Sequence, residues 1–490
     1  MSERDTFGTV DTRLLCGKRG FAQGLLVHLD AFLSYAMGVS GAGETVAMRV
    51  FWTIFLCFGT ALARAEPVAL PPGLTQVGLS ADENATAGNN ATHIARDSAG
   101  HVHMVWVDSG RQGEKTGPVY RRLNVAADGA VQLETPPVYI ADKTPGDWNA
   151  YPALAATGDT VFVVWQGGGT ARVRRFDGRE WGPVVDTGAK SDGRDVGPSM
   201  QADASGVRVV TPSGQFAIST DGGATWKTEP VPLPSGQHMK TASIAADPAG
   251  GVVLAFSSVV RDPKETAKNE GSGGYWQLRT IRRSSGGAWS DAGDVLAAFP
   301  EWAEAKGASD SLADWVRIGT DTAGGQHLLW HGTGISHIYG NDQAYYAYRA
   351  PKGEWQAPIP LVKRDDAKGI KFSFAPSLTL DGENVLATVF YDVYDGTRWA
   401  GFDADLVPFL RGTQHGAMLP LTHFVRASID AKKPVGALSS RFPSAALAPY
   451  HAPDGHVWLD MLETFIPMGV DGVPKSIVHQ RVDVTGAVKP

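Results

Sequence analysis

The sequence has few cysteines and no run of basic residues. Only two of its 490 residues are cysteines, Cys16 and Cys57, and both precede the cleavage point proposed below. A mature chain of this size needs no disulfide to bury a sufficient core. The net charge of −7 comes without clustered Lys and Arg, which argues against nucleic acid as a partner. No His-Glu-x-x-His or cysteine spacing supports zinc, so we predict no metal and no other cofactor.

Long apolar segments are also missing, apart from one short run over residues 50–59. The run follows Met48-Arg49 and precedes Ala63-Arg64-Ala65, which together give the basic start, apolar core and small residues of a signal peptide. Because the run is too short to span a bilayer, we predict a signal peptide over residues 48–65 and no membrane span in the mature chain. The protein is therefore expected in the periplasm or secreted.

Residues 1–47 lie upstream of a complete export signal. We therefore expect them to be a mis-annotated upstream extension, with Met48 as the true start, and a long natural n-region is the alternative. The large residues Phe55 and Leu56 before Cys57 argue against a lipoprotein. Residues 66–90 are expected to form a leader into a single domain over residues 91–490.

Glycine, proline and aromatic residues are abundant. The 58 Gly and 30 Pro stand beside 14 Trp and 12 Tyr. Gly and Pro destabilise the interior of regular elements, so this composition indicates many turns between short aromatic strands. It predicts an all-β fold.

One pattern recurs along the mature chain: an apolar strand start, Asp-x-x-Gly, and an alternating apolar strand that ends in an aromatic residue. The seven copies cover residues 94–106, 154–165, 200–210, 244–256, 318–330, 378–390 and 446–458. A second turn, in which Gly precedes Trp, follows in copies such as Arg175–Trp181, Arg283–Trp289 and Arg349–Trp355. Two such turns and the run after Trp make four antiparallel strands, which is the blade of a β-propeller. We predict seven blades, with six blades and a closing strand as the alternative.

The sharpest copy of the second turn is Ser219-Thr-Asp221-Gly-Gly223-Ala-Thr-Trp226, a complete Asp-box. In this repeat pattern, residues 90–485 resemble the sialidase superfamily of bacterial-neuraminidase-repeat (BNR) propellers. The resemblance implies that the box closes the turn between third and fourth strands. It also implies a catalytic Asp, a three-arginine clamp and a Tyr nucleophile helped by Glu, for which Tyr391 and Glu463 are the candidates. The Arg-Ile-Pro motif of authentic sialidases is absent, which argues against sialidase activity.

The loops divide between two faces of a propeller. The Asp-x-x-Gly and Gly-Trp turns share one face, here called the short-turn face, and the other connections share the opposite, long-loop face, where binding groups usually lie. The tryptophans that end second strands, Trp106, Trp165, Trp330 and Trp458, are expected to pack between blades. On the long-loop face the predicted catalytic residues are His337, Tyr339, Tyr391, Glu463 and Asp108. The predicted substrate-binding residues are Arg111, Trp148, Arg261, Trp302, His331, Asn341 and Arg441.

Aromatic rings mixed with Asp, Arg and His suit a sugar, because rings stack on its apolar face and charged groups bind its hydroxyls or carboxylate. We therefore predict an exported glycan-active protein, either a glycoside hydrolase or a polysaccharide lyase. A non-catalytic propeller that binds glycan or protein through the same face is the alternative.

Overall fold

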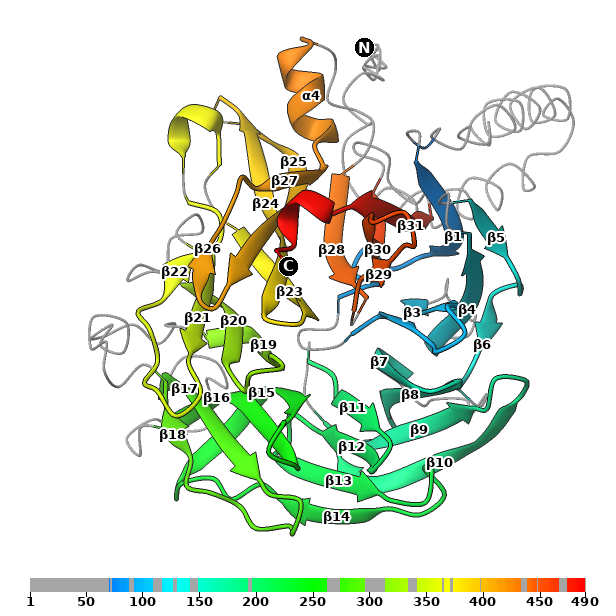
Figure 1. The fold of residues 1–490 in the computed structure, drawn as a ribbon, viewed down its shortest axis with the longest axis vertical. Coiled ribbons are helices and arrows are strands. Elements are labelled where there is room, and N and C mark those ends of the chain that lie inside the picture. Colours follow the sequence, from blue (N-terminus) through cyan, green and yellow to red (C-terminus); the bar gives the residue numbers. More distant parts are fainter. Residues whose placement is uncertain are drawn as a thin grey trace, which may run out of the picture. The chain divides into compact units, whose positions relative to one another are not determined.

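The fold is a β-propeller of seven antiparallel sheets, as seen in a computed structural model (Figure 1). The structure describes residues 70, 73–87, 92–108, 117–126, 130–141, 149–192, 196–261, 274–295, 313–333, 342–363, 365–370, 373–396, 398–432, 439–446, 448–466 and 474–489. This confirms the predicted all-β class and blade number. The predicted upstream extension and signal peptide lie outside the described residues.

Blades 1 to 6 are each built from consecutive strands, and the first strand of each lies nearest the propeller axis (Figure 1). Blade 1 contains β2 (Ile94–Arg96), β3 (Val102–Asp108), β4 (Gly117–Val125), β5 (Val131–Leu133) and β6 (Val138–Tyr139). Blade 2 contains β7 (Asn149–Thr157), β8 (Thr160–Gly167), β9 (Thr170–Phe176) and β10 (Trp181–Lys190). Blade 3 contains β11 (Ser199–Asp203), β12 (Gly206–Val210), β13 (Gln215–Ser219) and β14 (Lys227–Pro230).

The next three blades follow the same order. Blade 4 contains β15 (Gln237–Ala246), β16 (Val252–Arg261), β17 (Gly274–Arg283) and β18 (Gly293–Asp294). Blade 5 contains β19 (Ala313–Thr320), β20 (Gln326–Thr333), β21 (Asp342–Arg349) and β22 (Ile359–Pro360). Blade 6 contains β23 (Ser373–Asp381), β24 (Asn384–Asp395), β25 (Arg398–Leu410), β26 (Thr413–Gln414) and β27 (Leu419–Thr422).

Blade 7 joins the two ends of the propeller. Its strands β28 (Ser439–Ala445), β29 (Tyr450–His451), β30 (Val457–Ile466) and β31 (Lys475–Asp483) come from the C-terminal part. Its outer strand is β1 (Leu74–Ser80), which pairs antiparallel with β31 from Leu74 opposite Gln480 to Ser80 opposite Lys475. Figure 1 shows the blue β1 beside the red β31. The segment expected to be only a leader thus supplies the closing strand, and the six-blade alternative is wrong.

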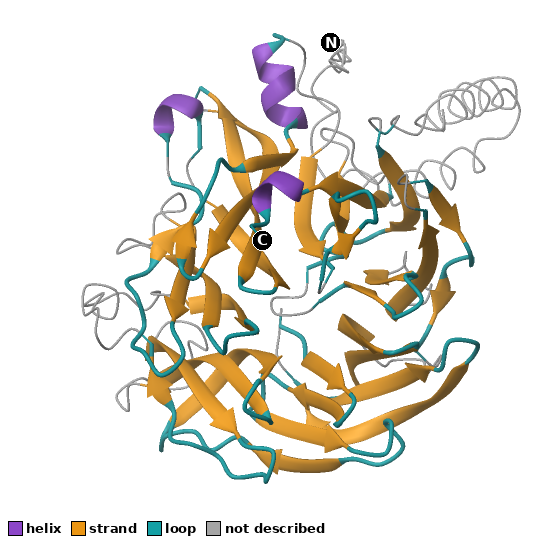
Figure 2. Ribbon diagram, viewed as in Figure 1, coloured by secondary structure: helices purple, strands orange, loops and turns teal. Residues whose placement is uncertain are grey.

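Helices are few in the described part of the chain (Figure 2). They are α4 (Phe424–Asp430), after the last strand of blade 6, and the 3-10 turns η2 (Asp366–Lys368) and η3 (Thr485–Ala487). No helix among the described residues is both long and apolar enough to cross a membrane.

The Asp-x-x-Gly turns join first to second strands, as predicted. The glycines Gly100, Gly250, Gly324 and Gly455 have φ between 89° and 91°, a conformation that glycine adopts without strain. In blade 1 the N–H of Gly100 donates to the carbonyl of Asp97 over 3.1 Å. The repeated sequence pattern therefore reports a repeated backbone conformation.

The Ser219–Trp226 turn joins β13 to β14, the third and fourth strands of blade 3. Asp221 accepts hydrogen bonds from the hydroxyl of Ser219 at 2.8 Å and the N–H of Thr225 at 2.9 Å. The indole N–H of Trp226 donates to the carbonyl of Gly223 at 3.1 Å. All of these bonds lie within the turn, so the motif stabilises blade 3 on the short-turn face.

The core lies between neighbouring blades. Trp106 and Trp165 are fully buried and Trp330 is 2% exposed, which confirms three of the four predicted core tryptophans. Between blades 1 and 2, for example, Trp165 packs with Val105 and Tyr120. Trp458 differs, because it is only partly buried and stacks on His456 with ring centroids 5.5 Å apart. The prediction of an inter-blade role for Trp458 is therefore wrong.

Two blades contain the same buried network of Asp, His and Tyr. In blade 1, His103 contacts Asp97 through Nε2 at 3.0 Å and the hydroxyl of Tyr120 through Nδ1 at 2.7 Å. In blade 5, the corresponding distances from His327 to Asp321 and Tyr346 are 2.9 and 2.8 Å. Each network fastens the first turn of the blade to its third strand.

Candidate functional site

Five of the predicted site residues have described side chains on the strands that run toward the long-loop face: Tyr391, Glu463, Asp108, His331 and Arg441. Arg261 is described only as the last residue of β16. The other six lie outside the described residues: His337, Tyr339, Arg111, Trp148, Trp302 and Asn341.

Tyr391 belongs to a cluster with a histidine and an aspartate in blade 6. The phenol oxygen of Tyr391 on β24 lies 3.1 Å from Nε2 of His423, which follows β27. The same nitrogen lies 2.5 Å from Oδ1 of Asp405 on β25. The side chain of His423 is 38% exposed, whereas that of Asp405 is 7% exposed and Tyr391 is buried. One accessible imidazole is thus held by two buried partners.

The electrostatics of this acid–base cluster (Tyr391, His423 and Asp405) separate the roles of its members. Burial raises the pKa of Tyr391, and the charges of Asp405 and Asp403 raise it further. The hydrogen bond with Asp405 raises the pKa of His423. The phenol therefore stays protonated at neutral pH and can act as a proton donor, while Asp405 stabilises the imidazolium form of His423.

Helix α4 holds the cluster in place. The carboxylate of Asp403 accepts hydrogen bonds from the backbone N–H groups of Val425 at 3.0 Å and Arg426 at 2.9 Å. Burial raises the pKa of Asp403 to about 6. Arg426 is close enough to oppose protonation of His423 and to stabilise a phenolate at Tyr391. It places a cation beside the cluster.

Glu463 lies on β30 in a different environment. It is fully buried, and its Oε2 accepts a hydrogen bond from the hydroxyl of Ser440 at 2.5 Å. Oε1 has no hydrogen-bond partner among the described residues. Burial raises the pKa of Glu463 to about 7. Glu463 and Ser440 share no sequence pattern, and the pairing of β28 with β30 brings them together.

Tyr391 and Glu463 are not brought together by the fold. Val389, Tyr391 and Val393 alternate along β24 and pack with Leu329 and Tyr346 of blade 5. Leu459 and Met461, which precede Glu463 at alternate positions of β30, pack with Phe390 and Leu406 on the other side of the blade 6 sheet. Tyr391 of blade 6 and Glu463 of blade 7 thus lie on opposite sides of the blade 6 sheet.

Arg441 is part of an aromatic surface to which Trp399 and the partly buried Trp315 contribute exposed rings, with the buried rings of Phe402 and Phe442 beneath them. Its guanidinium lies 5.2 Å from the ring centroid of Phe402 and 5.8 Å from that of Phe442, and Nη1 lies 3.2 Å from Oε1 of Glu83. Trp315 stacks on Phe442 with centroids 5.0 Å apart and an angle of 6° between the rings. Trp399 is 39% exposed. Exposed aromatic area beside an arginine suits the apolar face of a sugar.

Backbone geometry explains part of this surface, and the sequence analysis missed it. Tyr151, Trp315, Ala375 and Phe442 have φ between 48° and 55°, at equivalent bulges in the first strands of blades 2, 5, 6 and 7. Three of them precede a proline. Bulges redirect side chains, and left-handed non-glycine residues cluster at functional sites. The repeated aromatic or small residue before proline is the signal that could have found them.

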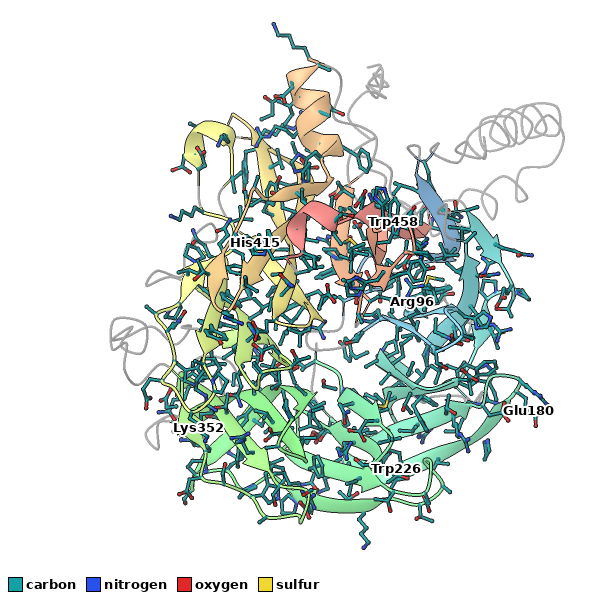
Figure 3. All side chains as sticks on the ribbon, viewed as in Figure 1. Arg96, Glu180, Trp226, Lys352, His415 and Trp458 are labelled. Atoms are coloured by element: carbon teal, nitrogen blue, oxygen red, sulfur yellow. The ribbon has the colours of Figure 1, made fainter. Side chains whose placement is uncertain are left out.

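The remaining described candidates have other settings. His331 is partly buried on β20, opposite Ala344 of β21. Asp108 is the last residue of β3. Its Oδ1 accepts a hydrogen bond from the N–H of Ala81 at 3.2 Å, and its Oδ2 accepts one from the hydroxyl of Tyr139. Arg96 of β2, labelled in Figure 3, binds Asp460 of blade 7. Among the described residues, no group of three or more His, Cys, Asp or Glu side chains is placed to hold a metal ion.

Comparison with known proteins finds similar structures at low sequence identity. No family model matches the sequence, and no curated protein does. Solved structures with a similar fold include an α-L-arabinanase of Penicillium chrysogenum complexed with arabinobiose, at 11% identity and a TM-score of 0.42 over 86% of this chain and 100% of that one. The leech intramolecular trans-sialidase is similar at 10% identity and a TM-score of 0.40, over 86% of this chain and 71% of that one. A polysaccharide lyase is similar at 12% identity and a TM-score of 0.36, over 81% of this chain and 78% of that one. At such values the likeness concerns the propeller alone.

Proposed function

We propose that the chain is an exported protein that acts on extracellular carbohydrate by β-elimination, as a lyase of uronic-acid polysaccharides. The observation that carries the proposal is the acid–base cluster, in which an exposed His423 is held by buried Tyr391 and Asp405 beside the cation Arg426. The aromatic surface around Arg441 supports a sugar chain as the ligand. Export rests on the signal peptide predicted over residues 48–65.

The chemistry of elimination matches the roles of the cluster. His423 removes the proton on C5 of a uronate, the electron pair forms the C4–C5 double bond, and the bond from C4 to the glycosidic oxygen breaks. Tyr391, protonated at neutral pH, gives its proton to that oxygen, and the imidazolium of His423 returns a proton to the phenolate across their 3.1 Å contact. No water is consumed. Arg426 neutralises the uronate carboxylate, which makes the C5 proton more acidic.

A hydrolase is less well supported by these positions. A retaining mechanism needs two carboxyl groups about 5–5.5 Å apart, or a Tyr nucleophile with an adjacent Glu as the sialidase resemblance implies. Tyr391 and Glu463 face opposite sides of one sheet. The BNR-like repeat and its single complete Asp-box therefore support the propeller scaffold in this proposal, and the mechanism rests on blade 6.

The test is turnover of uronate polymers by the full-length chain. Polygalacturonate, alginate and a glycosaminoglycan are offered, and products are followed by the ultraviolet absorbance of the new double bond. We expect unsaturated products, and we expect His423→Ala to lower kcat about 10²- to 10⁴-fold, the usual contribution of a general base. Tyr391→Phe and Asp405→Asn should also be impaired.

The matched control is His451→Ala, because His451 forms a similar pair with Asp381 at 2.9 Å but lies at the first turns, on the short-turn face. Its activity should equal that of the unaltered chain. New reducing ends without double bonds would instead show a hydrolase. Tight glycan binding without any product would show a non-catalytic module, and either outcome would refute the lyase.

A further inference from the structure

A second pocket lies between the closing strand β1 and blade 1, away from the acid–base cluster in blade 6. It has a volume of about 350 Å³ and is lined by residues of β1, β3, β4 and β6 and by Pro137. This volume is near the lower end for small-molecule sites, so the pocket suits one sugar ring rather than a chain. We call it the seam pocket.

A buried tryptophan carries an unused donor at the seam pocket. Trp106 lines the pocket and is fully buried, and its indole Nε1 has no hydrogen-bond partner among the described residues. A buried N–H without a partner is costly, and an acceptor atom of a ligand would remove that cost. Gly78 of β1 lies against the same edge of the indole, since a Cβ there would come within 2.4 Å of the ring. The closing strand β1 therefore leaves room for the indole of Trp106 only because position 78 is glycine.

A second donor comes from Arg121 on β4, which also lines the pocket. Its Nε donates to the carbonyl of Thr135 at 2.8 Å, and its Nη1 donates to the carbonyl of Val77. These bonds fix the guanidinium plane and leave the Nη2 protons for a ligand. Burial lowers the pKa of Arg121, which shows a cation partly removed from water. Such a group gains most from an anionic partner.

The opposite end of the seam pocket carries an acceptor. Arg121 of β4 lies opposite Met104 of β3, and Asp108 lies four residues further along β3 than Met104. The backbone positions of Arg121 and Asp108 are therefore roughly 13 Å apart along the strand direction. Tyr139 also lines this end, and its hydroxyl donates a hydrogen bond to Asp108. Between the two ends lie the apolar side chains of Val119, Leu79 and Pro137. The seam pocket thus offers the Arg121 donor at one end and a carboxylate at the other, with the apolar wall and Trp106, which pairs with Val119, between them.

We propose that the seam pocket binds a single hexuronate ring, with its carboxylate against Trp106 and Arg121 and its hydroxyls toward Asp108. This assigns Asp108 a role in binding rather than catalysis. The site is separate from the acid–base cluster and does not depend on elimination chemistry. Because the ligand touches both β1 and blade 1, binding stabilises the closure of the propeller and raises the melting temperature.

The experiment measures binding of D-galacturonate and D-glucuronate to the full-length chain by calorimetry, with D-galactose and D-glucose as neutral counterparts. We expect the acids to bind at least about tenfold more tightly, because a hydrogen bond to a charged group is worth about that factor. Trp106→Phe should weaken acid binding by about tenfold or more and reduce the ligand-induced rise in melting temperature.

Matched variants keep the test decisive. Trp165→Phe alters the corresponding tryptophan of blade 2, which is equally buried but does not line the pocket, and should bind normally. Asp108→Asn should weaken acids and neutral sugars alike. Its amide oxygen still accepts from Ala81 or Tyr139, so it tests the seam pocket even if Trp106→Phe does not fold. His423→Ala should bind the sugar acids normally, which separates this site from the proposed lyase activity. Equal binding of acids and neutral sugars, or normal binding by both Trp106→Phe and Asp108→Asn, would overturn the proposal.

Discussion

Glu463 offers the sharpest link between structure and a measurable quantity, through the substitution Glu463→Gln. The carboxyl group is fully buried on β30, with one oxygen bound by Ser440. Burial raises its pKa from 4.5 to about 7. Between these two values the folded chain keeps a proton that the unfolded chain releases. The contribution of Glu463 to stability is therefore complete below pH 4.5 and is lost as the pH rises to 7.

The size of the effect follows from the pKa change. At about 1.4 kcal/mol for each pKa unit, the difference between 4.5 and about 7 corresponds to a loss of about 3 kcal/mol at pH 8. Glutamine has nearly the same shape but does not titrate. In Glu463→Gln, the side-chain amide would place N–H donors where Oε1 of Glu463 has no hydrogen-bond partner among the described residues. The resulting loss of stability is the same at every pH. The stability of Glu463→Gln relative to the unaltered chain should therefore improve by about 3 kcal/mol between pH 4.5 and pH 8.

The assay is urea unfolding at both pH values, followed by tryptophan fluorescence and extrapolated to water. Contributions of other titrating groups cancel, because they are common to both chains. Glu180→Gln, in the exposed turn between β9 and β10 at the rim (Figure 3), is the control and should show no pH-dependent difference. An equal stability difference between Glu463→Gln and the unaltered chain at pH 4.5 and pH 8 would refute the assignment of a raised pKa to Glu463.

Two further predictions concern buried histidines. Replacing His327 by Ala removes both hydrogen bonds of the blade 5 network and leaves Asp321 and Tyr346 without their shared partner, so the free energy of unfolding measured in urea should fall by about 3 kcal/mol. Tyr346→Phe removes one of these bonds and should lower the free energy of unfolding by about 1 kcal/mol. His238→Ala, at an exposed position, should leave it almost unchanged. Burial lowers the pKa of His93 and of His479 to about 3, so each stays neutral in the fold while the unfolded chain binds a proton below pH 6.5. Stability should fall as the pH drops from 6.5, by about 1.4 kcal/mol per pH unit for each group, and replacing either His with Gln should reduce that slope; an unchanged slope in both variants would contradict the assignment.

The propeller was predictable because its signals are local and repeated. Each Asp-x-x-Gly turn needs a glycine with positive φ, and an alternating apolar strand follows the turn, so seven copies could be counted from the sequence. Strand β1 has neither signal. It is a single strand of seven residues, and its partner β31 lies about four hundred residues later in the chain. Nothing local distinguishes such a strand from a leader, since only the closure of the ring gives it a partner.

The site was less predictable, because it depends on register between strands. The sequence singled out Tyr391 by its position near a strand end, but Asp405 lies within the thirteen residues of β25. It reaches His423 only because β27 pairs with β25 so that Leu419 faces Leu406 and Thr422 faces Ala404. The packing of the blades likewise places Tyr391 and Glu463 on opposite sides of the blade 6 sheet. A prediction that placed them together needed a pairing that no local pattern specifies.

Histidine–aspartate pairs recur in this propeller, and burial separates the structural pairs from the chemical one. The side chains of His103 and His327 are fully buried and that of His479 is 1% exposed, and burial lowers the pKa of His103 and His479. The imidazoles of His103 and His479 therefore stay neutral, and none of the three buried rings can meet a substrate. His423 is 38% exposed, and its bond with Asp405 raises its pKa. Exposed pairs such as His451 with Asp381 lie at the first turns. Among the described residues, His423 combines an accessible ring, a buried carboxylate and a protonated tyrosine on the long-loop side, which suits this imidazole to proton transfer.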